Sequence, residues 1–442
     1  MRGAEPPRQC AAQAEPVNER EVSKSFQILG YKMGWDVIVV GGGAAGLWAA
    51  GTAAARGMRV LVLEKNNKPG VKILISGGTR CNITHHCDVE GIIQAFGNQG
   101  RFLKSALYQL TPDQVVQEIE RLGVATKIED TGKVFPVSNH AIDVRDALVR
   151  RLVQPGAELR SGVAVKDVSP CSEGGWQVHL ENESLHTKKV ILSTGGLSYS
   201  ECGTTGDGYA WVKKVGHIVT TTFPALTPLV SPSQWVHALK GITLPDVAVS
   251  VSSRELPKRE PRVTSRGGFL WTHFGCSGPA PMNVSRFVSS LAEPHKANLL
   301  IDLVPDIGEA ELAHMLDASQ AGKKNVQSVL HQLIPKNMVQ CLLGRAEVEE
   351  GVTLAELPRK SRMSLIEDLK KLCVPLSGTR GYGKAEVTMG GVKTQEVNPH
   401  TMESRLAPGL FLAGEILDVD GPIGGFNFQA AFSTGNLAAL NV

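Results

Sequence analysis

The sequence predicts an α/β fold built on a Rossmann-like domain that binds a nucleotide, and three stretches carry this prediction. Residues 36–50 are typical of a short apolar strand, a glycine turn and a helix of small residues. A second apolar strand follows and ends in Glu64. Near the C-terminus, residues 409–413 predict a further strand that runs into Gly414 and Glu415. Both ends of the chain therefore contribute to one nucleotide-binding domain.

The glycine turn has the spacing GxGxxG, with glycines at positions 41, 43 and 46. Gly41 permits a tight turn, Gly43 lets backbone N–H groups approach a pyrophosphate, and Gly46 lets the helix lie close to the strand. The carboxylate of Glu64 would accept hydrogen bonds from the ribose hydroxyls. GxGxxG alone could be only a glycine-rich turn, but the strand, the helix and the terminal glutamate favour an ADP group.

The C-terminal stretch distinguishes FAD from NAD. FAD has a ribityl chain whose hydroxyls need an acidic acceptor, here Glu415 or Asp418, and NAD has no group at that location. The following glycine turn, Gly424-Gly425, predicts a helix from about Phe426 whose N-terminal amides face the flavin. A surface helix after a glycine turn is the structural alternative. We expect noncovalent FAD in a domain of the glutathione-reductase type.

The middle of the chain adds a further strand and a second glycine cluster. Residues 189–196 predict a buried strand that ends in Thr194-Gly195-Gly196, and the cluster 203–208 precedes a helix with Asp207 as its N-cap. This cluster could be only a turn and a cap. Its position after a strand of the nucleotide-binding domain favours a contact with the cofactor.

Composition narrows the class of protein. A chain of 442 residues should form two or three domains. The formal charge of +3 comes from interspersed acids and bases, so we expect a small-molecule substrate and no nucleic acid. Eight scattered cysteines without a CxxC pair, and no apolar stretch of membrane-spanning length, predict a cytoplasmic protein without disulfides. Residues 1–32 predict a disordered extension, and Met33 is a candidate start of the functional chain.

Four blocks of sequence resemble the YhiN/BaiN-type NAD(P)/FAD-dependent oxidoreductases, and more distantly the fumarate reductase and aspartate oxidase flavoproteins. The blocks are KILISGGTRCNIT (72–84), VFPVSNHAIDV (134–144), THFGCSGPA (272–280) and the segment from VTMGGV to the C-terminal glycines (387–435). The resemblance implies an FAD domain interrupted by an inserted β-barrel-like part and a small helical part. We expect the FAD domain at 33–222 and 377–442, the β-rich part at 223–304, with an added piece of 350–376, and the helical part at 305–376.

The resemblance also places residues of the first block along the phosphates and the flavin. Thr79 stands where the family prefers glycine, and a threonine is costly there if the backbone needs a positive φ. A metal site at Cys81, His85, His86 and Cys87 is the alternative, but their spacing does not fit one and we expect no metal. The residues expected to bind FAD are Gly41, Gly43, Ala44, Ala45, Gly46, Glu64, Lys65, Lys72, Ser76, Gly77, Arg80, Cys81, Asn82, Val165, Thr194, Gly195, Gly414, Glu415, Asp418, Gly425, Phe426 and Asn427.

The predicted function is that of an FAD-dependent oxidoreductase that acts on a small organic substrate by hydride transfer through the flavin, with NAD(P)H as a candidate external donor. The alternative is a non-catalytic or RNA/protein-binding flavoprotein that uses FAD as a sensor or structural element. His273, in the Thr-His-Phe-Gly part of the third block, is the candidate catalytic acid. The structural alternative is that the His273 side chain only makes hydrogen bonds within a turn and takes no part in catalysis.

Overall fold

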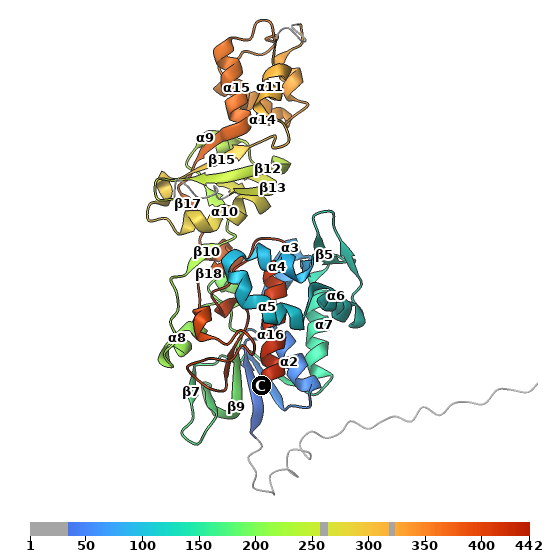
Figure 1. Cartoon of the computed structure of the whole chain (residues 1–442), viewed down its shortest axis with the longest axis vertical. Coiled ribbons are helices and arrows are strands. Elements are labelled where there is room, and N and C mark those ends of the chain that lie inside the picture. Colours follow the sequence, from blue (N-terminus) through green and yellow to red (C-terminus); the bar gives the residue numbers. More distant parts are fainter. Residues whose placement is uncertain (1–33, 257–263, 318–322) are drawn as a thin grey trace, which may run out of the picture. The chain divides into compact units, whose positions relative to one another are not determined.

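The computed structural model describes residues 34–256, 264–317 and 323–442 (Figure 1). The predicted disordered extension at 1–32 and the candidate start at Met33 lie outside the described residues.

The first sheet has a parallel Rossmann centre. β1 (Trp35–Val40) pairs in parallel with β2 (Val60–Glu64) and with β9 (Ser184–Leu192). β6 (Glu158–Ser161) extends the parallel part beside β2, and β19 (Leu410–Leu412) extends it beside β9. All of β2 and the last four residues of β1 are buried, as expected for parallel strands covered on both faces. The carboxyl ends of these strands share one edge of the sheet, where the glycine turn, Glu64 and Gly414 meet.

Antiparallel strands and helices complete this part of the chain. β9 continues into an antiparallel meander with β8 (Trp176–His179) and β7 (Asp167–Pro170). A small sheet contains β3 (Thr84–His85), β4 (Thr126–Ile128) and β5 (Lys133–Pro136). The helices are α3 (Val71–Thr79), α4 (Val89–Ala95), α5 (Gly100–Gln109), α6 (Pro112–Arg121), α7 (Ala141–Val153) and α8 (Asp207–Lys214).

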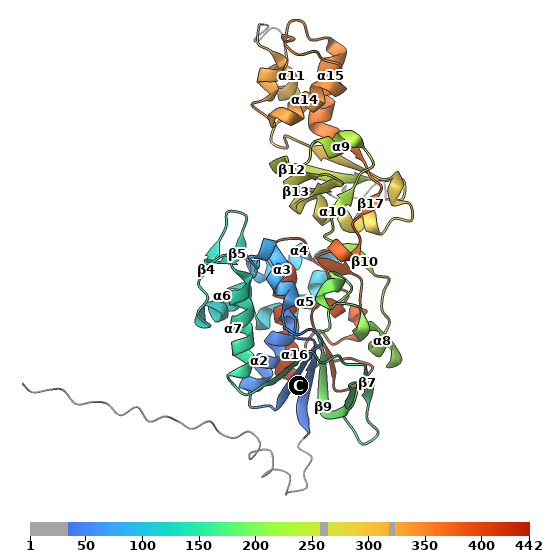
Figure 2. The same ribbon diagram turned by 180° about the vertical axis from the view of Figure 1, so that it is seen from behind.

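The two ends of the chain are joined by helix packing. α2 (Ala44–Ala55) lies beside α16 (Phe426–Asn441), as Figures 1 and 2 show. The rings of Trp48 and Phe432 are 4.9 Å apart between centroids. A Cβ on Gly435 would lie 2.4 Å from the carbonyl oxygen of Ala45, so only glycine permits this approach. The packing explains why the first and last segments of the chain form one site.

The second sheet is antiparallel, in the order β16-β15-β12-β13-β14-β11-β17. Its strands are β11 (Leu229–Val230), β12 (Thr243–Ser252), β13 (Thr264–Thr272), β14 (Gly275–Ser277), β15 (Asn298–Asp302), β16 (Leu372–Pro375) and β17 (Gly378–Thr379). In the chain, only Leu376 and Ser377 separate the two edge strands β16 and β17. The N–H of Leu376 donates to the carbonyl oxygen of Ala297, beside one edge of the sheet, and the N–H of Ser377 donates to the carbonyl oxygen of Val230, beside the other edge. Such a short link requires the sheet to curl until its edges approach, which gives the barrel-like form.

Helices accompany the second sheet. They are α9 (Gln234–Ala238), α10 (Pro279–Ser289), α11 (Glu309–Met315), α13 (Val326–Leu330), α14 (Lys336–Arg345) and α15 (Arg359–Lys371). Their apolar side chains join those of the second sheet in one buried cluster, distinct from the cluster around the first sheet. A two-stranded sheet of β10 (Phe223–Ala225) and β18 (Val387–Met389) lies where the chain passes between the two. The predicted domain boundaries stay a prediction.

Thr79 has a left-handed backbone, with φ of 69°, although it is β-branched and exposed. This conformation costs a side chain with a Cβ about 1–2 kcal/mol. We therefore expect Thr79→Gly to raise the free energy of unfolding by about 1 kcal/mol, measured by urea unfolding. The neighbouring Gly78, at φ of 67°, provides the reverse experiment, and Gly78→Thr should destabilise by a similar amount. A Thr79→Gly variant no more stable than the parent would contradict the claim that the backbone of Thr79 is strained.

Candidate functional site

A cavity of about 530 Å³ lies at the carboxyl-end edge of the first sheet. Its lining comes from both ends of the chain and from β13, β14 and α10. It brings together all the residues predicted to bind FAD except Gly46, Cys81, Asp418 and Phe426. The glycine turn and the C-terminal glycine segment therefore face the same space.

The four exceptions lie outside the lining for separate reasons. Gly46 packs against the carbonyl oxygen of Gly41, and Cys81 is fully buried. The carboxylate of Asp418 accepts hydrogen bonds from two neighbouring side chains. The ring of Phe426 stacks on His85, with centroids 4.5 Å apart. None of the four lines the cavity, and their contacts with FAD stay predictions.

Glu64 is held at the end of β2 by three hydrogen bonds. One carboxylate oxygen accepts from Gly42 N at 2.8 Å, and the other accepts from the backbone N–H and the side-chain amide of Asn66, both at 2.8 Å. Its side chain is buried yet lines the cavity. The three donors hold the carboxylate in one orientation at the edge of the cavity, an arrangement suited to a ribose diol.

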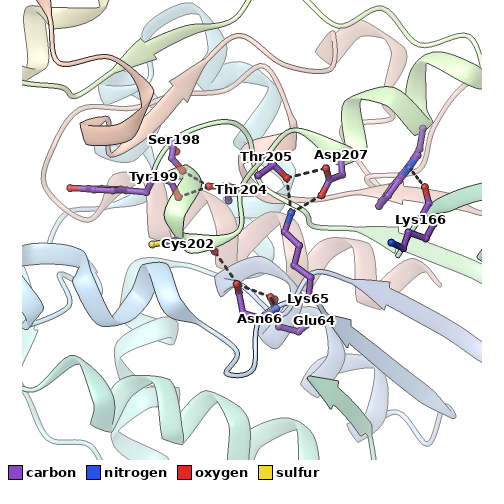
Figure 3. A network of polar contacts seen from close by, with 11 residues as sticks. Glu64, Lys65, Asn66, Lys166, Ser198, Tyr199, Cys202, Thr204, Thr205 and Asp207 are labelled. Atoms are coloured by element: carbon purple, nitrogen blue, oxygen red, sulfur yellow. Dashed lines mark hydrogen bonds and ion pairs between the residues drawn. The ribbon is translucent and has the colours of Figure 1, made fainter. Parts of the chain in front are cut away.

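A polar network joins the end of β2 to the loop before α8 (Figure 3). Lys65 Nζ lies 2.6 Å from Asp207 Oδ2 and 2.6 Å from Thr205 Oγ1. Asn66 Nδ2 donates to the carbonyl oxygen of Cys202 at 3.0 Å. The prediction that Asp207 is the N-cap of α8 was wrong: the N-cap is Gly206, and Asp207 pairs with the distant lysine instead. The second glycine cluster thus forms one wall of the cavity.

Lys72 and Glu415 form a second network where α3 meets the end of β19. Lys72 Nζ lies 2.7 Å from Glu415 Oε2 and donates to Ser198 Oγ at 2.7 Å. The other Glu415 oxygen accepts from the Ser198 hydroxyl and from Thr388 N, the latter at 2.9 Å. Both partners of the ion pair line the cavity, which places an acceptor and a cation where the sequence predicted a ribityl contact.

The loop after α3 connects the same cavity with the start of α16. Arg80 Nη1 pairs with Glu129 at 2.6 Å, and its guanidinium lies 4.0 Å from the centroid of the Phe135 ring. With its amide oriented to satisfy both partners, Asn82 accepts from Gly425 N at 2.9 Å. A Cβ on Gly425 would lie 2.4 Å from the carbonyl carbon of Thr84, so glycine is required for this contact.

Two observations show that the cavity fits FAD. A Cβ on Gly43 would meet no atom within 4 Å, which leaves open space beside the backbone at the start of α2, where a pyrophosphate would bind. The Thr194 hydroxyl is buried without a hydrogen-bond partner in the described residues and belongs to a residue that lines the same space. Gly43 and Thr194 would then contact the phosphates, and Glu64 and Glu415 the two sugar chains. When bound, FAD supplies the hydride chemistry.

His273 does not line the cavity. It lies exposed in the turn between β13 and β14, with its ring 5.0 Å from that of Phe274. Its catalytic role stays a prediction. In residues 34–256, 264–317 and 323–442, no group of three or more His, Cys, Asp or Glu side chains could hold a metal ion. None of the helices in these ranges is long and apolar enough to cross a membrane.

The lining of the cavity also contains residues that were not predicted from the sequence, among them Lys133, Tyr199 and Glu386. Lys133 begins β5, Tyr199 follows β9, and Glu386 precedes β18. None belongs to a glycine motif. Glu386 could have been found from the sequence, because it directly precedes the VTMGGV block.

Asp420 and Arg286 form a buried ion pair between the C-terminal segment and α10. Arg286 Nη1 lies 2.8 Å from Asp420 Oδ2, and the aspartate side chain is only 2% exposed. Its second oxygen has no partner in the described residues. Burial raises the pKa of Asp420 to about 6, although the charge of Arg286 lowers it. The carboxyl group of Asp420 therefore binds its proton more tightly in the folded state than in the unfolded chain.

We expect Asp420 to make the folded state less stable as the pH rises. Its protonated form stabilises the fold fully below the unfolded pKa of about 4, and this contribution is lost by the time the pH has passed about 6. Asp420→Asn should remove this slope and raise the stability at pH 7 by up to about 3 kcal/mol, measured by urea unfolding at pH 4.5 and 7. The exposed Asp130→Asn serves as the control. Equal slopes in Asp420→Asn and the parent would contradict the prediction.

The fold and the cavity define a Rossmann-type flavoprotein. The chain belongs to the HI0933-like family, whose Rossmann domain matches residues 35–441. It is 32% identical over 406 residues to the ribosomal RNA dihydrouridine synthase of Escherichia coli (strain K12), covering 90% of this chain and 96% of that protein. It is 29% identical over 406 residues to the 3-dehydro-bile acid delta(4,6)-reductase of Clostridium scindens, covering 90% and 97%.

A solved structure shares the fold. The 3-ketosteroid delta1-dehydrogenase from Sterolibacterium denitrificans, in complex with 1,4-androstadiene-3,17-dione, has a TM-score of 0.50 and 14% sequence identity, over 92% of this chain and 98% of that one. Family membership makes this chain an FAD-dependent oxidoreductase, which confirms the predicted family, fold class, enzyme class and cofactor. The individual cofactor-binding residues and the use of NAD(P)H stay predictions.

Proposed function

We propose that the protein reduces a carbon–carbon double bond conjugated with a carbonyl group, using electrons from a reduced nicotinamide nucleotide. The single observation that carries the proposal is that the cavity extends beyond the predicted nucleotide contacts to Leu270, Ser277–Pro279 and Met282. This mostly apolar wall suits an organic substrate at the junction between the FAD-binding segments and the second sheet. Substrate would therefore bind where the second sheet closes the cavity.

The names of two relatives support the proposal that the reduced double bond is conjugated with a carbonyl group. A dihydrouridine synthase reduces the uracil double bond, which is conjugated with a carbonyl group, and it is named for ribosomal RNA. A delta(4,6)-reductase of a 3-dehydro bile acid reduces double bonds conjugated with the 3-oxo group. The two substrates differ in size and polarity but share this conjugated group. Hydride addition to such a bond is favoured because the carbonyl oxygen accepts the charge that develops.

RNA uridine is the second candidate substrate, because a relative named for ribosomal RNA aligns over 96% of its length. The sequence predicts no nucleic-acid partner, because a formal charge of +3 provides little attraction for phosphates. An organic conjugated ketone and RNA uridine present the same reacting group, so both are tested as substrates.

The experiment is anaerobic stopped-flow absorbance. NADH or NADPH should reduce the bound flavin, and a 4,6-dien-3-one steroid or a uridine-rich ribosomal RNA should reoxidise it. A saturated 3-oxo steroid and an RNA whose uridines are already reduced are the matched controls. Reoxidation by neither conjugated compound would overturn the proposal, and reoxidation by RNA alone would select the second candidate.

A further inference from the structure

Glu386 places a carboxylic acid in the cavity without a partner. Its backbone is fixed, because its N–H donates to Leu226 O at 3.1 Å and the next residue begins β18, which pairs with β10. The side chain lines the cavity, and within the described part of the chain no hydrogen bond or ion pair holds its carboxyl group. An acid in such a position costs free energy unless it binds a ligand or stays protonated. Burial raises the pKa of Glu386, although Lys133 and Lys72 lower it.

Lys133 is a cation without a partner in the same cavity. It is the first residue of β5, and it lines the cavity together with Glu386. Lys72, the other lysine that acts on Glu386, is already held by Glu415 and Ser198. Lys133 forms no ion pair with Glu386 or with any other acid of the described residues. A carboxylic acid and a cation that line one cavity without touching can each contact a different atom of a ligand between them.

Tyr199 supports a functional role for this part of the cavity. It is an aromatic residue with a left-handed backbone, φ of 50° and ψ of 61°, a conformation that costs about 1–3 kcal/mol. A hydrogen bond from its N–H to Tyr382 O at 2.9 Å holds it there, and its side chain lines the cavity. Burial raises the pKa of Tyr199 and the charge of Glu386 adds to the effect, so the phenol stays protonated. Strain of this kind is concentrated at functional sites.

We propose that Glu386 is the proton donor of the reduction and that Lys133 binds the carbonyl oxygen of the substrate. The proposal rests on the reductase function given above. When bound, FAD would supply a hydride to the β-carbon of the substrate, and the two electrons of that hydride would derive from the reduced nicotinamide nucleotide. The α-carbon accepts the proton of the Glu386 carboxylic acid, and the carbon–carbon double bond becomes a single bond. The Glu386 carboxylate then takes a proton from water, while the ammonium of Lys133 stabilises the charge that develops on the carbonyl oxygen.

The first test separates the two half-reactions. Glu386→Gln keeps the shape of the side chain, so FAD content and the rate of flavin reduction by the nicotinamide nucleotide should match the parent. The rate of reoxidation by the 4,6-dien-3-one steroid should fall about 100-fold to 10,000-fold. Glu367→Gln, at an exposed position on α15, is the control and should reoxidise at the parental rate. Tyr199→Phe tests the neighbouring phenol.

A second test measures binding without turnover. Equilibrium dialysis of a saturated 3-oxo steroid against the oxidised protein should show about tenfold weaker binding for Lys133→Met and unchanged binding for Glu386→Gln, because only the lysine contacts the oxygen. Parental reoxidation by Glu386→Gln, or a loss confined to Tyr199→Phe, would overturn the donor assignment while the reductase function stands. Unchanged binding by Lys133→Met would overturn the role of the lysine. No reoxidation of the parent by any conjugated compound would overturn both the function and the inference.

Discussion

Replacing Glu64 with lysine is expected to leave a protein that does not retain FAD during gel filtration. The substitution removes the acceptor that faces the ribose and places an ammonium beside Gly42 N and Asn66 N, the two backbone donors that now bind the carboxylate. Hydrogen bonds to a charged group contribute about 1.5–3 kcal/mol, so the Kd for FAD should rise about 100-fold or more. The ratio of flavin absorbance to protein after gel filtration measures the loss.

Two further variants distinguish a loss of binding from a loss of folding. Glu64→Gln keeps an acceptor oxygen of the same shape and should retain FAD with weaker affinity. Glu158→Lys, an exposed position on the neighbouring strand β6, should bind FAD as the parent does. Unchanged FAD affinity in Glu64→Lys would show that another acceptor contacts the ribose. The loss of FAD by Glu158→Lys would show that a charge change on the neighbouring strand also disturbs the site.

The sequence predicted those parts of the site in which a local motif determines the backbone. GxGxxG requires a strand, a turn and a helix in order, and the structure places β1, the turn and α2 there. Glu64 and Glu415 could be predicted because Glu64 ends β2 and Glu415 follows β19, and the carboxyl ends of these strands share the edge predicted to face the nucleotide. The packing of α16 on α2 explains why motifs nearly 400 residues apart meet.

Residues that reach the cavity from other elements could not be predicted in this way. Lys133 begins β5 and Glu386 directly precedes β18, which belong to two different small sheets, so their approach depends on tertiary packing rather than on spacing. Asp207 was misassigned for a similar reason, since its partner Lys65 lies 142 residues earlier. His273 shows the converse, because a recognisable block does not specify which way a turn residue points. Thr79 adopts the positive φ that would explain why the family prefers glycine at this position.

Gly46 and Gly43 should separate folding from cofactor binding. A Cβ on Gly46 would lie 1.9 Å from the carbonyl oxygen of Gly41 and 2.6 Å from Ser193 Oγ. The first of these atoms belongs to the backbone at the end of β1, so α2 must move away from the sheet to accommodate it. We expect Gly46→Ala to destabilise the fold by about 3 kcal/mol, measured as a lower midpoint of urea unfolding.

Gly43→Ala adds the same methyl group three residues earlier and should have the opposite pattern. Its Cβ would meet no protein atom within 4 Å, so the unfolding midpoint of the protein freed of FAD should match the parent. The methyl group would instead project into the space predicted for the pyrophosphate, and FAD affinity should fall by about tenfold or more. Parental FAD affinity in Gly43→Ala would place the pyrophosphate elsewhere. Both variants change glycine to alanine at one turn, so a large difference between them is expected to come from what each Cβ meets, protein backbone at Gly46 and the predicted pyrophosphate at Gly43.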